Sequence, residues 1–132
     1  MNARHLLAGT AIASVVAVLA AAFSLTGSPS HQRQLALDRR RVALLQQTAY
    51  AIAQRYDEAS LPDALPDAIV QNDPESGRPF EYRRMSGTRY QLCATFALAG
   101  EDDPAYAYGE DASRWNHGPG KRCFTERIAP AR

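Results

Sequence analysis

The sequence has little net charge, few cysteines and none of the compact motifs that mark common catalytic sites. Its formal charge is +1 over 132 residues, so the chain as a whole gives no electrostatic reason to expect a nucleic-acid partner. It contains no phosphate-binding glycine loop and no Cys-x-x-Cys spacing, which are typical signatures of nucleotide and zinc sites. The sequence therefore predicts a protein that is not an enzyme and that needs no cofactor and no metal.

Charged side chains are also absent from one long stretch near the N-terminus. Residues 6–25 are 20 consecutive positions without a single charge. A helix of this length, with a rise of about 1.5 Å per residue, extends roughly 30 Å and matches the hydrocarbon core of a bilayer. We expect an uncleaved signal anchor that spans the membrane once. The alternatives are a signal peptide cleaved at the small residues 20–22 and a buried helix of a soluble protein.

The basic residues and the cysteines favour opposite orientations of this span. Only Arg4 and the terminal amine precede the span, whereas Arg33 and the arginines at residues 39–41 follow it. A count of basic residues would therefore place the larger part of the chain inside the cytoplasm. Two cysteines without any other thiol motif indicate instead an oxidising compartment, in which a disulfide persists. We expect the domain after the span to lie outside the cytoplasm.

Small residues recur along one side of the predicted span. Gly9, Ala13, Ala17 and Ala21 are spaced four residues apart, so a helix would place them on one face. Such a stripe lets membrane helices approach closely. It predicts helix association, and ordinary alanine-rich filler is the alternative.

A break and a second helix follow the span. Residues 26–30 (TGSPS) contain helix-interrupting residues, which predicts an anchor and break over residues 1–29 and an α+β domain over residues 30–132. Apolar positions then recur at steps of three and four, which predicts an amphipathic helix over residues 32–59. A coiled coil has similar spacing, but Asp38 would occupy a core position. The predicted apolar face comprises Leu35, Val42, Leu45, Ala49, Ile52 and Tyr56.

The arginines at residues 39–41 lie shortly after the predicted span. Arginine side chains this close to a membrane can contact anionic lipid headgroups. The alternative is a solvated face of the second helix.

A small antiparallel sheet is predicted over residues 79–128. Alternating patterns indicate strands over residues 79–84, 88–98 and 121–128. In the last two strands Cys93 and Cys123 fall on the side that the apolar residues avoid, so paired strands would bring both to the outer face of the sheet. We expect a disulfide there. Free thiols, a redox-active pair and a zinc site with His117 are the alternatives.

Residues 99–120 form a long stretch rich in glycine, proline and acidic residues. Aromatic residues in loops are enriched at interfaces, so the stretch is a candidate site for a peptide, a glycan or an envelope protein. A covering role for Trp115 over the sheet is the alternative. The acidic residues are expected to be solvated, with calcium binding as the alternative. The candidate partner-binding residues are Tyr106, Tyr108, Trp115 and His117, and the acidic ones are Glu101, Asp102, Asp103, Glu110 and Asp111.

With an apolar span, an amphipathic helix and a small sheet in this order, the chain resembles type II secretion pseudopilins and related type IV pilin-like proteins, most of them uncharacterised. The prepilin leader is absent, because Gly9 is followed by Thr10 and no acidic residue precedes Asp38. The resemblance therefore concerns the architecture after the leader. It is carried by Leu61, Pro62, Asp73, Pro74, Gly77, Pro79, Tyr82, Tyr90, Leu92, Cys93, Ala94, Trp115, His117, Gly120, Cys123 and Phe124.

The resemblance implies a bacterial, single-pass inner-membrane protein with its C-terminal domain in the periplasm. It implies an α+β fold in which a transmembrane helix precedes an amphipathic helix packed on about three antiparallel strands. It also implies a structural or assembly component of the cell envelope that is related to secretion, with protein partners or self-association. A monomeric anchored binding module that uses residues 99–120 is the alternative.

Overall fold

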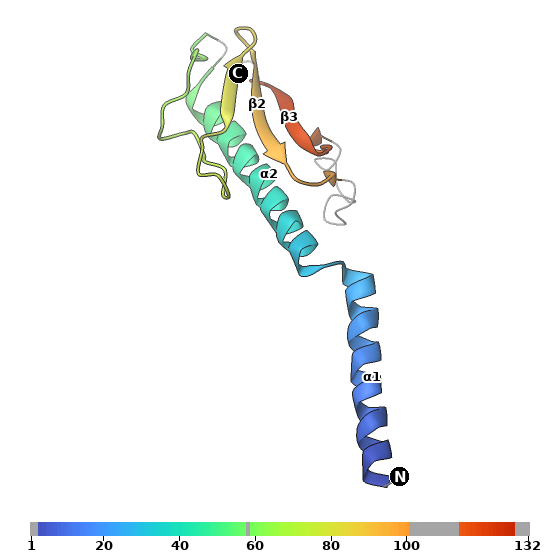
Figure 1. The fold of residues 1–132 in the computed structure, drawn as a ribbon. Coiled ribbons are helices and arrows are strands. Elements are labelled where there is room, and N and C mark those ends of the chain that lie inside the picture. Colours follow the sequence, from blue (N-terminus) through green and yellow to red (C-terminus); the bar gives the residue numbers. More distant parts are fainter. Residues whose placement is uncertain (1–2, 58, 101–113, 129–132) are drawn as a thin grey trace. The chain divides into compact units, whose positions relative to one another are not determined.

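The fold is α+β and is shown in Figure 1, a computed structural model that describes residues 3–57, 59–100 and 114–128. The contacts divide the chain into two compact units, one up to Arg33 and the other from Gln34 onward. In order, the elements are α1 (Ala3–Thr26), α2 (Pro29–Arg55), β1 (Glu81–Arg84), β2 (Arg89–Phe96) and β3 (Gly120–Arg127).

Helix α1 is long and apolar enough to cross a membrane, and its described side chains are exposed. Leu7, for example, is 71 % exposed. The hydroxyl groups of Thr10, Ser14 and Ser24 donate hydrogen bonds to carbonyls three or four residues earlier in the same helix. This pairing within the helix satisfies hydroxyls that would be costly to leave unpaired in a lipid environment.

The break between the helices is shorter than predicted, because α2 already begins at Pro29. Gly27 has φ +76°, a conformation open to glycine, and its amide donates to the Phe23 carbonyl at the end of α1. Ser28 precedes α2, and its hydroxyl accepts a hydrogen bond from the His31 amide. Proline is favoured at the first position of a helix and serine just before it, so Pro29 starts α2 instead of prolonging the break.

The other end of the predicted helix over residues 32–59 is also corrected, since α2 ends at Arg55. The Tyr56 amide still bonds to the Ile52 carbonyl, but Asp57 then turns the chain. Its carboxylate accepts hydrogen bonds from the Ser60 hydroxyl and the Ala59 amide. Side-chain bonds of this kind compete with helix continuation.

One face of α2 packs on the sheet, as the apolar spacing predicts. Leu45 and Ile52 are fully buried in one cluster with Leu92 of β2 and Phe124 of β3. Burying a side chain of this size stabilises the fold by roughly 1.5 to 3 kcal/mol. Of the six predicted positions, Leu35, Val42, Leu45 and Ile52 are buried, and Ala49 and Tyr56 are partly buried.

The sheet is antiparallel with the strand order β1-β2-β3. Each strand begins or ends within two residues of its predicted limits. The connection before β1 is held by Tyr82, whose hydroxyl donates to the Pro62 carbonyl at 2.7 Å. Asn72 and Pro79 form an isolated antiparallel bridge. Pro79 therefore pairs with the segment before the turn at residues 73–78 and is not part of β1.

Candidate functional site

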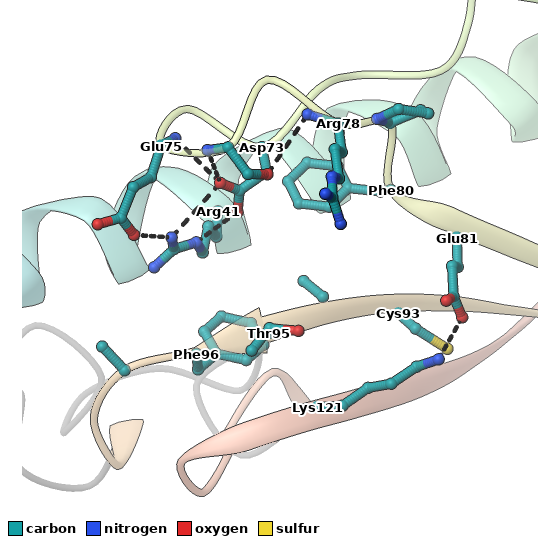
Figure 2. Close-up of a pocket in the computed structure, with 14 residues that line it drawn as sticks. Arg41, Asp73, Glu75, Arg78, Phe80, Glu81, Cys93, Thr95, Phe96 and Lys121 are labelled. Atoms are coloured by element: carbon teal, nitrogen blue, oxygen red, sulfur yellow. Dashed lines mark hydrogen bonds and ion pairs between the residues drawn. The ribbon is translucent and has the colours of Figure 1, made fainter.

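A pocket of about 480 Å³ lies between residues 73–80 and strand β2 (Figure 2). One wall is formed by the turn that carries Asp73, Glu75 and Arg78. The other wall is formed by β2 from Cys93 to the end of the strand, with Lys121 of β3 beside it. The turn therefore contributes charged side chains to the pocket, and β2 forms the facing wall.

The turn at residues 73–78 has the geometry that its sequence predicts. The Asp73 amide donates to the Arg78 carbonyl, and the Gly77 amide donates to the Asp73 carbonyl. Gly77 has φ +69°, a conformation that costs glycine little. The Asp73 carboxylate accepts hydrogen bonds from the amides of Glu75 and Ser76 at 2.9 and 2.8 Å, so this carboxylate organises the turn from within.

Arg41 joins this turn to α2 and is only 4 % exposed. Its guanidinium donates to Asp73 at 2.5 Å, to Asp38 at 2.7 Å and to Glu75 at 2.5 Å. Both interpretations of this arginine from the sequence, a solvated face and a lipid contact, are therefore wrong. Arg41 is buried instead of solvated because three carboxylates offset the cost of burying its charge.

Arg41 and Asp73 shift each other's pKa in the directions expected for an ion pair. Burial opposes the charge on Arg41, but its hydrogen bonds to the three carboxylates outweigh burial and raise its pKa above the ordinary value. Burial would likewise raise the pKa of Asp73. Hydrogen bonds from Arg41 and from the amides of Ser76 and Glu75 outweigh that effect and lower the pKa to about 2. Both groups are therefore charged at neutral pH.

Asp38 connects the same network to the end of β2. Its carboxylate accepts hydrogen bonds from the amides of Ala97, at 3.1 Å, and Leu98, at 2.9 Å. Asp38 is buried beside Arg41. The acidic residue that weakens a coiled-coil interpretation of α2 therefore caps a strand inside the domain.

Two of the predicted partner-binding residues are buried. Trp115 is buried and packs against Phe124, with ring centroids 4.7 Å apart. His117 is buried and stacks on Phe96 at 3.7 Å, and burial lowers its pKa. These contacts favour the covering role of Trp115 over a surface contact. Tyr106, Tyr108 and the five predicted acidic residues lie outside the described residues.

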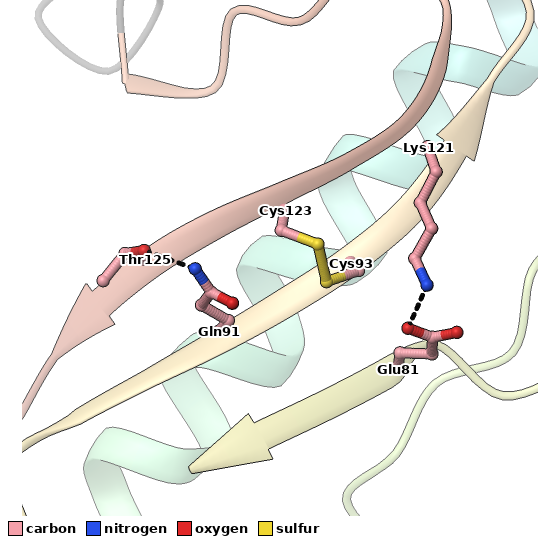
Figure 3. The surroundings of a disulfide bond; sticks show 6 residues. All are labelled: Glu81, Gln91, Cys93, Lys121, Cys123 and Thr125. Atoms are coloured by element: carbon pink, nitrogen blue, oxygen red, sulfur yellow. Dashed lines mark hydrogen bonds and ion pairs between the residues drawn. A yellow bond between two sulfur atoms is a disulfide. The ribbon is translucent and has the colours of Figure 1, made fainter. Parts of the chain in front are cut away.

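The predicted disulfide joins Cys93 and Cys123, which are direct partners in the register of β2 and β3 (Figure 3). It lies on the face of the sheet that also carries Gln91, bonded to Thr125, and Glu81, paired with Lys121. Because the two sulfur atoms are bonded to each other, the free-thiol and zinc alternatives are wrong. Within the described part of the chain, no group of three metal-binding side chains comes together.

The small residues at positions 9, 13, 17 and 21 are all exposed on α1. Their four-residue spacing in a continuous helix puts them on one side of it. This face remains the predicted helix-association stripe.

Sequence reasoning missed the contact between Arg41 and Asp73, which are 32 residues apart. The local signal was Asp38, an acid on an apolar helix face three residues before an arginine. Comparisons of the chain with protein-family models, with curated proteins and with solved structures find no match.

Proposed function

We propose that this protein is a membrane-anchored, pseudopilin-like structural or assembly component of the bacterial cell envelope, related to secretion. The observation that carries the proposal is helix α1, whose apolar side chains are exposed along the described length of the helix. Exposure of so much apolar surface to water is unfavourable. A bilayer removes that cost, and the satisfied hydroxyls of the helix suit it for the hydrocarbon core.

The second unit supports an extracytoplasmic location. Its two cysteines form a disulfide, and such bonds persist in oxidising compartments. We place α1 in the inner membrane and the α+β unit in the periplasm. A helix packed on a small antiparallel sheet is also the layout that the resemblance to pseudopilins implies.

Anchoring and compartment are tested together by intact-mass analysis of the protein extracted from membranes. A full-length mass, with both thiols protected from an alkylating reagent until a reductant is added, supports the proposal. A mass that lacks the apolar segment would support signal-peptide cleavage instead. Two thiols that react without reductant would contradict the periplasmic location.

Assembly is tested separately by cross-linking in native membranes. We expect Ala13→Cys, on the small-residue stripe, to form a disulfide-linked dimer under mild oxidation because small side chains permit close helix approach. Val15→Cys is the matched control, since a position two residues away lies on another side of the helix. Equal cross-linking of both variants, or of neither, would contradict helix association through the stripe.

A further inference from the structure

The outer face of the sheet, opposite to the face that packs on α2, carries an excess of positive charge. Figure 3 shows this face, which holds the disulfide and the pair of Glu81 with Lys121. Because alternate residues of a strand share a face, Arg83, Arg89 and Arg127 lie on it as well. Of its ten strand positions, four are cationic and one, Glu81, is acidic. This face therefore has a formal charge of +3, whereas the whole chain has +1.

Three arginines gather at one end of this face. The register makes Arg89 of β2 and Arg127 of β3 direct partners. Because the Ile128 amide donates to the Thr88 carbonyl, the arginines next to that pair form a non-hydrogen-bonded pair, in which side chains lie closer together. The cysteines form a pair of the same class, with Cα atoms 4.0 Å apart. Arg83 of β1 lies diagonally across from Arg89. These three residues are called the arginine corner below.

The described residues do not neutralise the arginine corner. Its three side chains are exposed, and none of them forms an ion pair with a described residue. Glu81, the one acid of this face, attracts Arg83 but is paired with Lys121. Like charges directly opposite each other on neighbouring strands are destabilising. An anionic partner at the corner would remove that cost.

The chain itself contains a stretch of complementary charge. Residues 101–113, which lie outside the described residues, hold five of the 14 acidic residues of the sequence and no lysine or arginine. A guanidinium group binds a carboxylate through two parallel hydrogen bonds. Tyr106 and Tyr108 lie among these acids, and a guanidinium group also stacks on tyrosine rings. The stretch therefore matches a surface of arginines both in charge and in its aromatic residues.

The described residues that flank this stretch lie on the α2 side of the sheet. Before it, the Gly100 amide donates to the His117 carbonyl at 2.7 Å, and His117 stacks on Phe96 of the packed face. After it, Arg114 pairs with Glu126, which is buried on the same face. The arginine corner lies on the opposite face. A neighbouring molecule can therefore present its stretch to the corner directly, whereas the stretch of the same molecule would first have to pass around the edge of β3.

We propose that the arginine corner binds residues 101–113 of a second copy of this chain, with carboxylates of that stretch paired to Arg89 and Arg127. Each copy has one corner and one acidic stretch, so the contact is head-to-tail and can repeat from copy to copy. This inference rests on the proposed assembly function and identifies the partner as the chain itself.

The first test is photo-cross-linking of the purified full chain in detergent micelles. A benzophenone amino acid replaces Thr125, which lies on the outer face two residues from Arg127, in a mixture of isotopically labelled and unlabelled chains. We expect mass spectrometry to find a cross-link from this position to residues 101–113 of a chain with the other label. The same group at Gln54, an exposed position of α2, is the control and should give no such cross-link.

Charge substitutions test the pairing itself. Arg89→Gln with Arg127→Gln should reduce the cross-link roughly tenfold, because charge-assisted hydrogen bonds are lost. Arg40→Gln with Arg55→Gln, at two exposed positions of α2, makes the same change in net charge and should leave the cross-link unchanged. Salt at about 0.5 M should weaken the cross-link of the unaltered chain several-fold. Formation of the disulfide and an unchanged Trp115 emission spectrum would verify the fold of each variant.

A mixing experiment assigns the two binding groups to different copies. One chain, with Arg89→Glu and Arg127→Glu, keeps its acidic stretch but has no basic corner. The other chain, with the five acids of residues 101–113 replaced by Asn or Gln, keeps the corner but has no acidic stretch. Neither chain alone should form the cross-link. Their mixture should restore it, from the corner of the second chain to the stretch of the first.

Three results would overturn the inference. The first is a cross-link from Thr125 to residues 101–113 of the same chain only, since the corner would then be covered from within. The second is the absence of any cross-link to residues 101–113, whether or not the corner is joined to a lipid or to an unlike protein. The third is equal cross-linking of the two double glutamine variants. Each result leaves the mass and cross-linking experiments on α1 unaffected, so failure of this inference is distinguishable from failure of the proposed function.

Discussion

Asp38 in helix α2 accepts a 2.9 Å hydrogen bond from the Leu98 amide, so a buried carboxylate of the helix holds the residues that follow the middle strand. The same carboxylate lies 2.7 Å from the guanidinium of Arg41. Strand end, helix and turn therefore depend on one network of charges.

Replacing Arg41 should destabilise the domain strongly. Arg41→Met would leave three carboxylates without their shared cation, one of them buried, and removal of one partner from a buried pair typically costs about 3 to 5 kcal/mol. Urea unfolding of the full chain in micelles, followed by Trp115 fluorescence, measures the loss. Arg40→Gln is the matched control because Arg40 is exposed, and it should change the free energy of unfolding by less than about 0.5 kcal/mol. Equal effects of the two substitutions would contradict the network.

Asp73 should make the domain sensitive to acid. Its pKa in the folded state is about 2, below the value of 3.8 expected without the fold. Its contribution is therefore present above the unfolded pKa and is lost as the pH falls through the folded pKa. The shift corresponds to about 2 kcal/mol.

The measurement is the free energy of unfolding of the unaltered chain and of Asp73→Asn as a function of pH. The difference between them should be largest above about pH 5 and should shrink toward about pH 2. Asp67→Asn, at an exposed position, is the matched control. A difference that is independent of pH would mean that the Asp73 charge is not stabilising.

His117 should add a second pH dependence at higher pH. Burial lowers its pKa below the ordinary 6.5, so the folded state favours the neutral ring. Its contribution is complete above the unfolded pKa and declines as the pH falls below that value. His117→Phe can retain the stacking on Phe96 without a titrating group. We expect this variant to lose less stability than the unaltered chain between about pH 7 and pH 5. A parallel decline in both proteins would contradict the prediction.

Removing the disulfide should lower stability by roughly 3 to 4 kcal/mol in the chain-entropy model, since it closes a loop of 30 residues. We expect Cys93→Ala with Cys123→Ala to unfold at lower urea concentration than the oxidised chain. Reductant should shift the midpoint of the unaltered chain toward that of the double variant and should not affect the double variant. If the oxidised chain and the variant unfold together, the bond does not stabilise the domain.

Patterns with a fixed local period could be predicted from the sequence. The apolar steps of α2 and the alternation around Cys93 and Cys123 identify the buried helix face, the pairing of β2 with β3 and the disulfide. The pocket edge could not be predicted in this way. It depends on the bridge between Asn72 and Pro79 and on the contact of Arg41 with Asp73, which join segments without a shared period.

The burial of His117 was missed for a related reason. It follows a polar, glycine-rich stretch, and composition there predicts exposure. In the structure its ring stacks on Phe96, and its carbonyl accepts a hydrogen bond from the Gly100 amide. Tertiary contacts of this kind override local composition because they bring together residues that are distant in the sequence.

The bond between Cys93 and Cys123 also determines the products of a proteolytic cut in the second unit. A single cut between these two residues would leave the two fragments covalently joined through the paired strands. Such a clipped chain would migrate as one species on a non-reducing gel and as two species after reduction. Analyses under non-reducing conditions alone would therefore count nicked molecules as intact ones.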